Sequence, residues 1–123
     1  NMELVKKEQP FAEPMLFNLV FGHKGGMQPV PEMLSAFRSF VPKDALWGVT
    51  HFGRDNWTFL AMAIAMGASV VRVGFEDSPY LAEGEAAEHN YQIVEKTAAL
   101  IRSMGLDTAS PMEAREILHL KKK

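Results

Sequence analysis

Three short apolar runs, each followed by an amphipathic stretch, divide most of this chain into repeating units. The runs cover Met15 to Phe21, Ala45 to Phe52 and Ser69 to Glu76. Their length, and the Gly and Pro residues that flank them, predict buried β-strands rather than helices. The stretches between them carry apolar residues at spacings of three and four, which predicts amphipathic helices. Three strand–helix units in series predict an α/β protein with a parallel sheet and right-handed crossovers.

Residue types that start helices support these predictions. Pro31 suits the first position of the helix after the first strand. Asp55 or Asn56 is expected to cap the second helix. The last helix is expected to open at Ser110, which forms a capping box with Glu113. Before it, a long helix is expected to bury one stripe of apolar residues: Ala87, Tyr91, Val94, Ala98 and Ile101.

The third predicted strand begins apolar and ends in charge. Strand side chains alternate between faces, which places Val71, Val73 and Phe75 on one side and Arg72, Gly74 and Glu76 on the other. Asp77 follows at the carboxyl end, where α/β sheets place their chemistry. The pattern is compatible with a functional site and equally with a structural Arg72–Glu76 ion pair, because buried charges are usually paired.

The inner positions of the predicted strands are unusually polar for a face covered by helices. They are Asn18, Gly48, Thr50, Arg72 and Glu76. Parallel sheets are covered on both faces in nearly every case, whereas three units leave one face and two edges open. The economical explanation is that residues 15–123 form the C-terminal part of a TIM (β/α)₈ barrel, preceded by a polar lead-in over residues 1–14.

Composition narrows the classes of function. The chain has 123 residues, the size of one domain, and a formal net charge of -2. This balance gives no electrostatic case for nucleic acid or an anionic membrane as partner. No apolar run approaches the roughly 18 residues that a membrane span requires. The absence of cysteine excludes disulfides and thiol chemistry and fits a cytoplasmic protein.

Three motifs, in this order, resemble the β-keto acid cleavage enzymes, whose best-described activity is the cleavage of 3-keto-5-aminohexanoate. They are residues 17–22 with Gly25-Gly26, residues 47–50 with Gly53-Arg54, and residues 71–77, which read Val-Arg-Val-Gly-Phe-Glu-Asp. Asn90 and residues 109–116 agree as well. The resemblance covers about residues 15–120, and the third motif is specific in the company of the other two.

The resemblance implies a zinc-dependent acyltransferase on a TIM barrel, which converts a β-keto acid and acetyl-CoA into acetoacetate and a new CoA thioester. Glu76 matches the family's zinc ligand, and zinc would polarise the keto oxygen as a Lewis acid. Arg72 and Asp77 match the dyad that helps to deprotonate the substrate. Contacts with substrate or CoA are expected at Gly25, Gly26, Thr50 and Arg54. Arg54 pairs either with the substrate or with a neighbouring strand.

The chain lacks part of the zinc-ligand pattern of the family. The family's other zinc ligands are two histidines in a His-x-His motif, and this chain contains no such motif. His23 and His51 lie at predicted strand ends, where a hydrogen-bonded wall residue is more common than a ligand.

Two hypotheses follow for the chain as a whole. In the first, it is the C-terminal piece of a β-keto acid cleavage enzyme, carries part of the site, is inactive alone and has the N-terminal part of the barrel as its partner; homo-oligomers, in which copies cover one another's open face and edges, belong to the second. The alternative is a non-catalytic α/β module that keeps the family scaffold for assembly or binding. Both predict that the chain is not a lone monomer.

Overall fold

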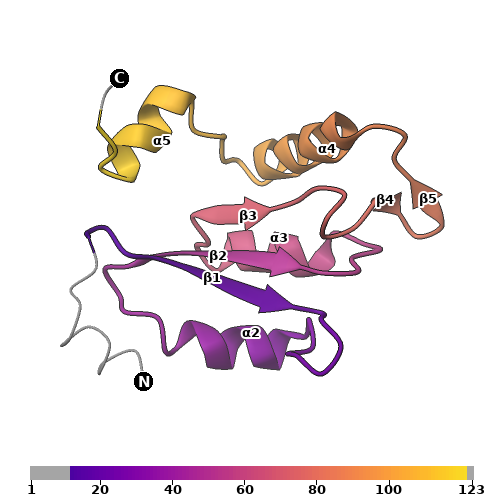
Figure 1. The fold of residues 1–123 in the computed structure, drawn as a ribbon, viewed down its shortest axis with the longest axis horizontal. Coiled ribbons are helices and arrows are strands. Elements are labelled where there is room, and N and C mark those ends of the chain that lie inside the picture. The colour runs from indigo at the N-terminus through magenta and orange to yellow at the C-terminus, as the bar shows by residue number, and fades with distance from the viewer. Residues whose placement is uncertain (1–11, 122–123) are drawn as a thin grey trace.

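The structure, a computed structural model, describes residues 12–121. A parallel three-stranded sheet lies at its centre, in the order β1 (Leu16–Phe21), β2 (Leu46–His51) and β3 (Val70–Arg72) (Figure 1). The connecting and following helices are α2 (Pro31–Arg38), α3 (Thr58–Ala65), α4 (Asn90–Ser103) and α5 (Pro111–Ile117). The predicted α/β class, with parallel strand–helix units, is confirmed.

The sheet has one covered face and one open face. On β2, Trp47, Val49 and His51 are buried on the covered face, where the core also contains Leu34 of α2 and Phe59 of α3. Burial of such apolar side chains is the main source of stability in a fold of this size. This core holds the three strands in the register that brings their carboxyl ends to one edge.

The open face carries the polar inner positions that the sequence predicts. Asn18 Nδ2 donates a hydrogen bond to Thr50 Oγ1 at 3.0 Å, and Thr50 lies opposite Arg72 in the register. Gly48 allows β3 to approach on this side, because a Cβ at position 48 would lie 2.4 Å from the carbonyl oxygen of Val70. Leu16, Val20 and Val70 are exposed on the same face. Apolar residues exposed together in this way favour a covering partner.

The third strand ends earlier than the sequence predicts. Alternation is predicted to continue to Glu76, but β3 ends at Arg72 and the chain then turns. Gly74 adopts a φ of +148°, and the amides of Asp77 and Ser78 both donate to its carbonyl oxygen, at 3.0 and 2.9 Å. Phe75 is therefore exposed, and the prediction that it shares the covered face with Val71 is wrong.

The helix α4 buries a different stripe from the predicted one. Its buried residues are Ile93 and Thr97, whereas Tyr91 and Val94 are exposed. Val94 lies beside the free edge of β3, where no described element covers it. A periodic pattern shows which residues favour burial, but the presence of a neighbour decides which are buried.

The predicted helix starts at Pro31 and Ser110 agree with the structure, whereas α4 starts at Asn90, after the predicted stripe residue Ala87. Ser110 Oγ accepts a hydrogen bond from the Glu113 amide at 3.3 Å, and Glu113 accepts one from the Ser110 amide at 2.8 Å. These bonds to Ser110 lower the pKa of Glu113. The N-cap of α3 is Trp57, without a side-chain cap, and the predicted cap at Asp55 or Asn56 is one or two residues too early; Asn56 Oδ1 accepts from the Thr58 amide at 3.1 Å from the position before the cap.

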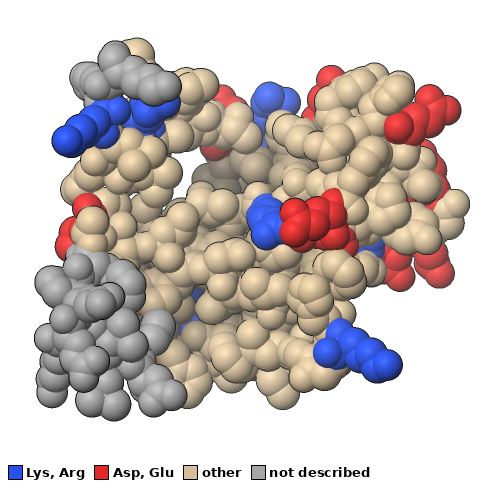
Figure 2. All heavy atoms as spheres, in the orientation of Figure 1, with Lys and Arg blue, Asp and Glu red and all other residues tan. Residues whose placement is uncertain are grey.

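The loop after β3 contains one unpredicted element, the antiparallel hairpin of β4 (Tyr80–Ala82) and β5 (Glu85–Ala86). It turns through Gly84, whose φ is +76°. Acidic side chains gather around this hairpin, while few charged residues lie over the three strands (Figure 2). Of the helices in residues 12–121, none is long and apolar enough to cross a membrane.

Candidate functional site

A charged cluster lies where β3 ends. The three parallel strands all point the same way, so the loops that follow them lie at one edge of the sheet (Figure 1). Arg72 is the last residue of β3, and Glu76 and Asp77 lie in the turn that follows. Such an edge is the usual position of the site in α/β proteins.

Arg72 binds both carboxylates of this turn. Its Nε lies 3.0 Å from Asp77 Oδ2 and its Nη2 lies 3.0 Å from Asp77 Oδ1, a two-point contact that fixes the guanidinium in one plane. Nη2 also lies 2.8 Å from Glu76 Oε1. Asp77 is 7% exposed, the Arg72 side chain 45% exposed, and Glu76 is turned to solvent. The three predicted residues are thus in direct contact.

The charges of this cluster keep Arg72 protonated. Its hydrogen bond to Glu76 and the nearby charge of Asp77 raise the pKa of Arg72 above an already high value. An arginine in this state does not act as a base. Nη1 forms no hydrogen bond within residues 12–121, so the two N–H donors of this nitrogen remain available on a fixed cation.

Backbone contacts hold the turn against the neighbouring loop. The Gly53 amide donates to the Asp77 carbonyl at 2.8 Å, and Ser78 Oγ donates to the carbonyl of Arg54. On the other side, the Phe75 amide donates to Asn90 Oδ1 at 2.9 Å. Sequence reasoning missed Ser78 and the contact of Asn90; the only signal was that Asn90 agrees with the family pattern.

Arg54 is buried against a tryptophan, and its predicted pairing with substrate stays a prediction. The residue is 2% exposed, and its guanidinium lies 3.8 Å from the centre of the Trp57 ring. Nη1 and Nη2 are buried and have no hydrogen-bond partner among the described residues, so Arg54 is not paired with a neighbouring strand. Burial lowers the pKa of Arg54.

The two strand-end histidines lie outside the charged cluster. His51 is buried on the covered face, edge-on to Phe59 with ring centres 5.2 Å apart. Burial, and then the charge of Arg54, lower the pKa of His51. The His23 ring stacks on Phe52 at 4.2 Å. Nδ1 of His51 is buried and has no hydrogen-bond partner among the described residues, so the expected hydrogen-bonded wall position is not seen for this nitrogen.

The glycine loop after β1 forms a tight turn. The Gly26 amide donates to the carbonyl of His23 at 2.9 Å, which leaves it unavailable to a ligand. Gly25 adopts a φ of +77° and has no neighbour within 4 Å of the position its Cβ would take. Contact of this loop with substrate or CoA stays a prediction.

The part of the chain that the structure describes does not form a complete zinc site. Within it, no group of three or more His, Cys, Asp or Glu side chains is arranged to hold a metal ion. Glu76 is exposed and its carboxylate contacts only Arg72. Structural and catalytic zinc sites use at least three protein ligands.

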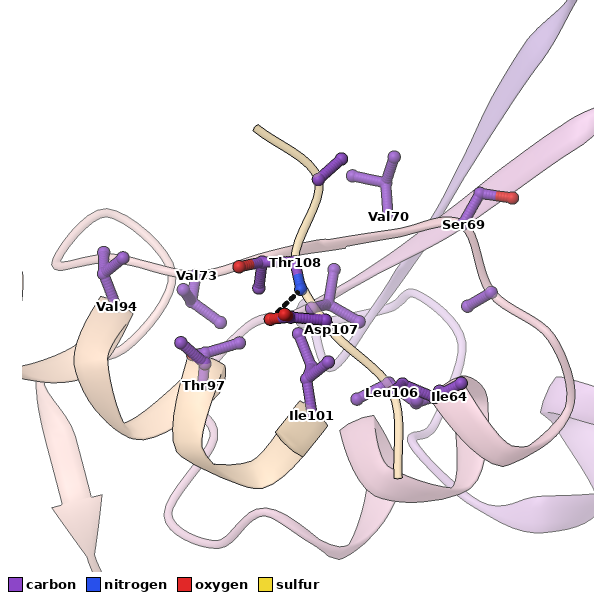
Figure 3. Close-up of a pocket in the computed structure, with 14 residues that line it drawn as sticks. Ile64, Ser69, Val70, Val73, Val94, Thr97, Ile101, Leu106, Asp107 and Thr108 are labelled. Atoms are coloured by element: carbon purple, nitrogen blue, oxygen red, sulfur yellow. Dashed lines mark hydrogen bonds between the residues drawn. The ribbon is translucent and has the colours of Figure 1, made fainter. Parts of the chain in front are cut away.

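Two apolar hollows flank the free edge of β3. One, of about 590 Å³, lies between α4, the start of β3 and residues 106–109 (Figure 3). The only carboxylate in its lining is that of Asp107, which accepts a hydrogen bond from the Thr108 amide at 2.8 Å. The other, of about 480 Å³, lies on the open face. Both are lined by the same four valines: Val70, Val71, Val73 and Val94.

The parallel sheet and the Arg72 cluster define an α/β protein with a charged site at the carboxyl ends of its strands. The chain belongs to the beta-keto acid cleavage enzyme family, whose model matches residues 1–120. The resemblance seen in the motifs is therefore confirmed.

Three named enzymes are similar to this chain over most of its length. Over 109 residues the chain is 40% identical to the 3-keto-5-aminohexanoate cleavage enzyme of Acetoanaerobium sticklandii, covering 89% of this chain and 40% of the relative. It is 37% identical over 117 residues to the enzyme of that name from Fusobacterium nucleatum, covering 95% of this chain and 42% of the relative. It is 36% identical over 112 residues to the 3,5-dioxohexanoate:acetyl-CoA acetone transferase of Paraburkholderia graminis, covering 88% and 36%. The chain thus spans about two fifths of the length of these relatives.

Proposed function

We propose that this chain is the C-terminal part of an enzyme that converts a β-keto acid and acetyl-CoA into acetoacetate and a CoA thioester. Family membership supports the reaction class, and two relatives are named as acetyl-CoA transferases. The observation that carries the proposal is the two-point contact between Arg72 and the buried Asp77 at the carboxyl edge of the sheet.

The rest of the enzyme is proposed to be a TIM barrel in which residues 15–123 supply three β/α units and a terminal helix. An open sheet face and free strand edges support this, because a barrel covers both. The two hollows along β3 support it further, since four valines line the place that a neighbouring strand would occupy. In a closed barrel the open face becomes the interior.

Asp77 is proposed as the base and Arg72 as the cation that stabilises the product of deprotonation. Asp77 takes the proton from the carbon between the two carbonyl groups of the β-keto acid, and the electron pair moves onto the keto oxygen as an enolate. Because Asp77 is 7% exposed and both its carboxylate oxygens contact Arg72, the proton is proposed to reach it through a water molecule. Transfer through Arg72 itself is disfavoured, since its raised pKa makes a neutral arginine too costly.

Glu76 is proposed to supply one zinc ligand in the complete enzyme. It is exposed at the same edge, and its second carboxylate oxygen forms no bond within residues 12–121. The other ligands have to come from outside this chain or from another copy, because the described residues do not fit the ion. When bound, zinc would supply Lewis-acid polarisation of the keto oxygen.

Thr50, Gly25, Gly26 and Arg54 are proposed to shape the substrate side of this edge. Thr50 lies opposite Arg72 in the register, but it is 2% exposed and its hydroxyl is bonded to Asn18, so its role is to support this edge rather than to contact the substrate directly. For Arg54 the buried position favours a role behind the site, where its carbonyl holds Ser78 and its charge faces Asp77.

A chimeric protein tests the proposal. Residues 12–123 are joined to the N-terminal part of the Acetoanaerobium sticklandii relative, and acetoacetate is measured with acetyl-CoA and 3-keto-5-aminohexanoate. Activity is expected from the chimera and not from this chain alone. Asp77→Asn should abolish it, while Asp44→Asn, an exposed carboxylate just before β2, should not. If the chimera folds but forms no acetoacetate from any β-keto acid tested, the proposal is wrong.

A non-catalytic assembly module is the second candidate, and the exposed apolar face of the sheet favours it. In that case copies of the chain cover one another's open faces and edges. Light scattering on the purified chain separates the cases: stable oligomers support assembly, and a folded monomer of 13.7 kDa counts against self-association.

A further inference from the structure

We infer that Asn90 is a positioning residue for the Arg72–Asp77 pair. The inference rests on the proposed function in one respect only, namely that this pair is catalytic. Asn90 touches neither member of the pair. It acts through the turn that carries Glu76 and Asp77.

Asn90 holds the beginning of the turn by one backbone hydrogen bond. Its Oδ1 accepts from the Phe75 amide at 2.9 Å, across fifteen positions of sequence and the whole β4–β5 hairpin. Asn90 is the first residue of α4, and Ile93 and Thr97 bury that helix against the rest of the fold. The acceptor is therefore presented by an anchored helix rather than by a loop.

Gly74 makes this contact possible. A Cβ at position 74 would lie 3.1 Å from Asn90 Oδ1, closer than nine in ten real Cβ contacts, and the φ of +148° is one that side chains rarely adopt. Gly74 and Asn90 thus form a matched pair, in which the missing side chain of one admits the amide of the other.

Besides its internal bonds to the Gly74 carbonyl, the turn is held against neighbouring segments at two places, and Asn90 supplies one of them. The second is the Gly53 amide on the Asp77 carbonyl, with Ser78 bound to Arg54 beside it. Between these points Glu76 is exposed and held only through Arg72. Without the Asn90 acceptor, the backbone at Phe75 loses its hydrogen bond to α4. The carboxylates of Glu76 and Asp77 then no longer approach the Arg72 guanidinium from one fixed direction.

Amide and guanidinium exchange measured by NMR on the ¹⁵N-labelled chain tests the inference without any need for activity. In Asn90→Ala, exchange of the Phe75 amide is expected to rise about tenfold, the effect of one lost hydrogen bond. Exchange of Arg72 Nε–H should rise with it, because its bond to Asp77 depends on the turn. Asn90→Asp keeps an acceptor at the same place and should restore both signals towards those of the unmodified chain.

A matched control separates positioning from loss of stability. Ser110→Ala removes a side-chain acceptor of a backbone amide at the start of α5, far along the chain from the site, and should leave both signals unchanged. If Asn90→Ala leaves Arg72 Nε–H unchanged, or if Asn90→Asp behaves like Asn90→Ala, the inference is overturned. Should Asn90→Ala not fold, Asn90→Gln displaces the oxygen by one methylene and gives the same comparison.

The chimeric enzyme adds a catalytic measurement. Asn90→Ala is expected to lower kcat about tenfold and to leave KM within about twofold, since the contacts with substrate are untouched. A rise in KM at constant kcat would contradict a positioning role. An inactive chimera would count against the proposed function, while the exchange measurements would still decide the role of Asn90.

Discussion

Replacement of the buried Arg54 by methionine is expected to stabilise this chain. Nη1 and Nη2 have no hydrogen-bond partner among the described residues, and the residue is 2% exposed. Buried donors left unpaired cost about 1–3 kcal/mol each, and more where the group is charged. The contact with Trp57 at 3.8 Å returns about 2 kcal/mol at most. Methionine fills a similar volume, so Arg54→Met should raise the free energy of unfolding by ~1–4 kcal/mol.

A second arginine beside a tryptophan provides the control. Arg38 lies 5.3 Å from the centre of the Trp47 ring, but its Nη1 donates to the carbonyl of Val41 at 3.1 Å. Arg38→Met loses a satisfied hydrogen bond and should lower the free energy of unfolding by ~0.5–1.5 kcal/mol.

Urea unfolding followed by circular dichroism compares the two variants, since tryptophan fluorescence would itself respond to both substitutions. The decisive result is that Arg54→Met raises the free energy of unfolding while Arg38→Met lowers it. If Arg54→Met destabilises the chain as much as Arg38→Met does, the Arg54 guanidinium has partners and the reasoning fails. A stabilised but inactive chimera carrying Arg54→Met would show that the site retains this charge at the expense of stability.

Two further predictions concern the covered face and the helix α4. Burial lowers the pKa of His51 below its ordinary value of 6.5, so the unfolded chain binds more protons between these two values. The contribution of His51 to stability is therefore fully present above about pH 6.5 and is lost on acidification. His51→Asn should remove this contribution to the pH dependence of the free energy of unfolding, measured by urea titrations at several pH values. If the pH dependence is the same in the variant, the assignment to His51 is wrong. Ile93→Ala should cost ~2–5 kcal/mol of unfolding free energy because Ile93 is fully buried, whereas the exposed Val94→Ala should cost far less in the chain alone. In the chimera the cost of Val94→Ala should increase, and an equal cost in both proteins would argue against a strand beside β3.

Local patterns in the sequence determined the class of the fold and most element boundaries. The apolar runs are continuous in sequence, and Pro31 and the Ser110 box act over four residues or fewer, so these features can be recognised without the fold. The strand pattern also predicted the Arg72–Glu76 pair, because these residues lie four positions apart. An extended strand would have placed Asp77 on the opposite face, so the pattern did not predict the complete cluster. Its assignment to a reaction came from the family resemblance, not from the pattern.

Only the tertiary structure decided the end of β3, the environment of Arg54 and the contact of Asn90. Each depends on segments far apart in the chain: the Gly53 amide binds the Asp77 carbonyl, Ser78 binds the carbonyl of Arg54 across 24 positions, and fifteen positions separate Phe75 from Asn90. The exposure of Val94 shows the same limit, since its periodic position favours burial but no described element covers it. Periodicity reports what a residue prefers, whereas packing against distant segments settles which backbone and charged groups meet.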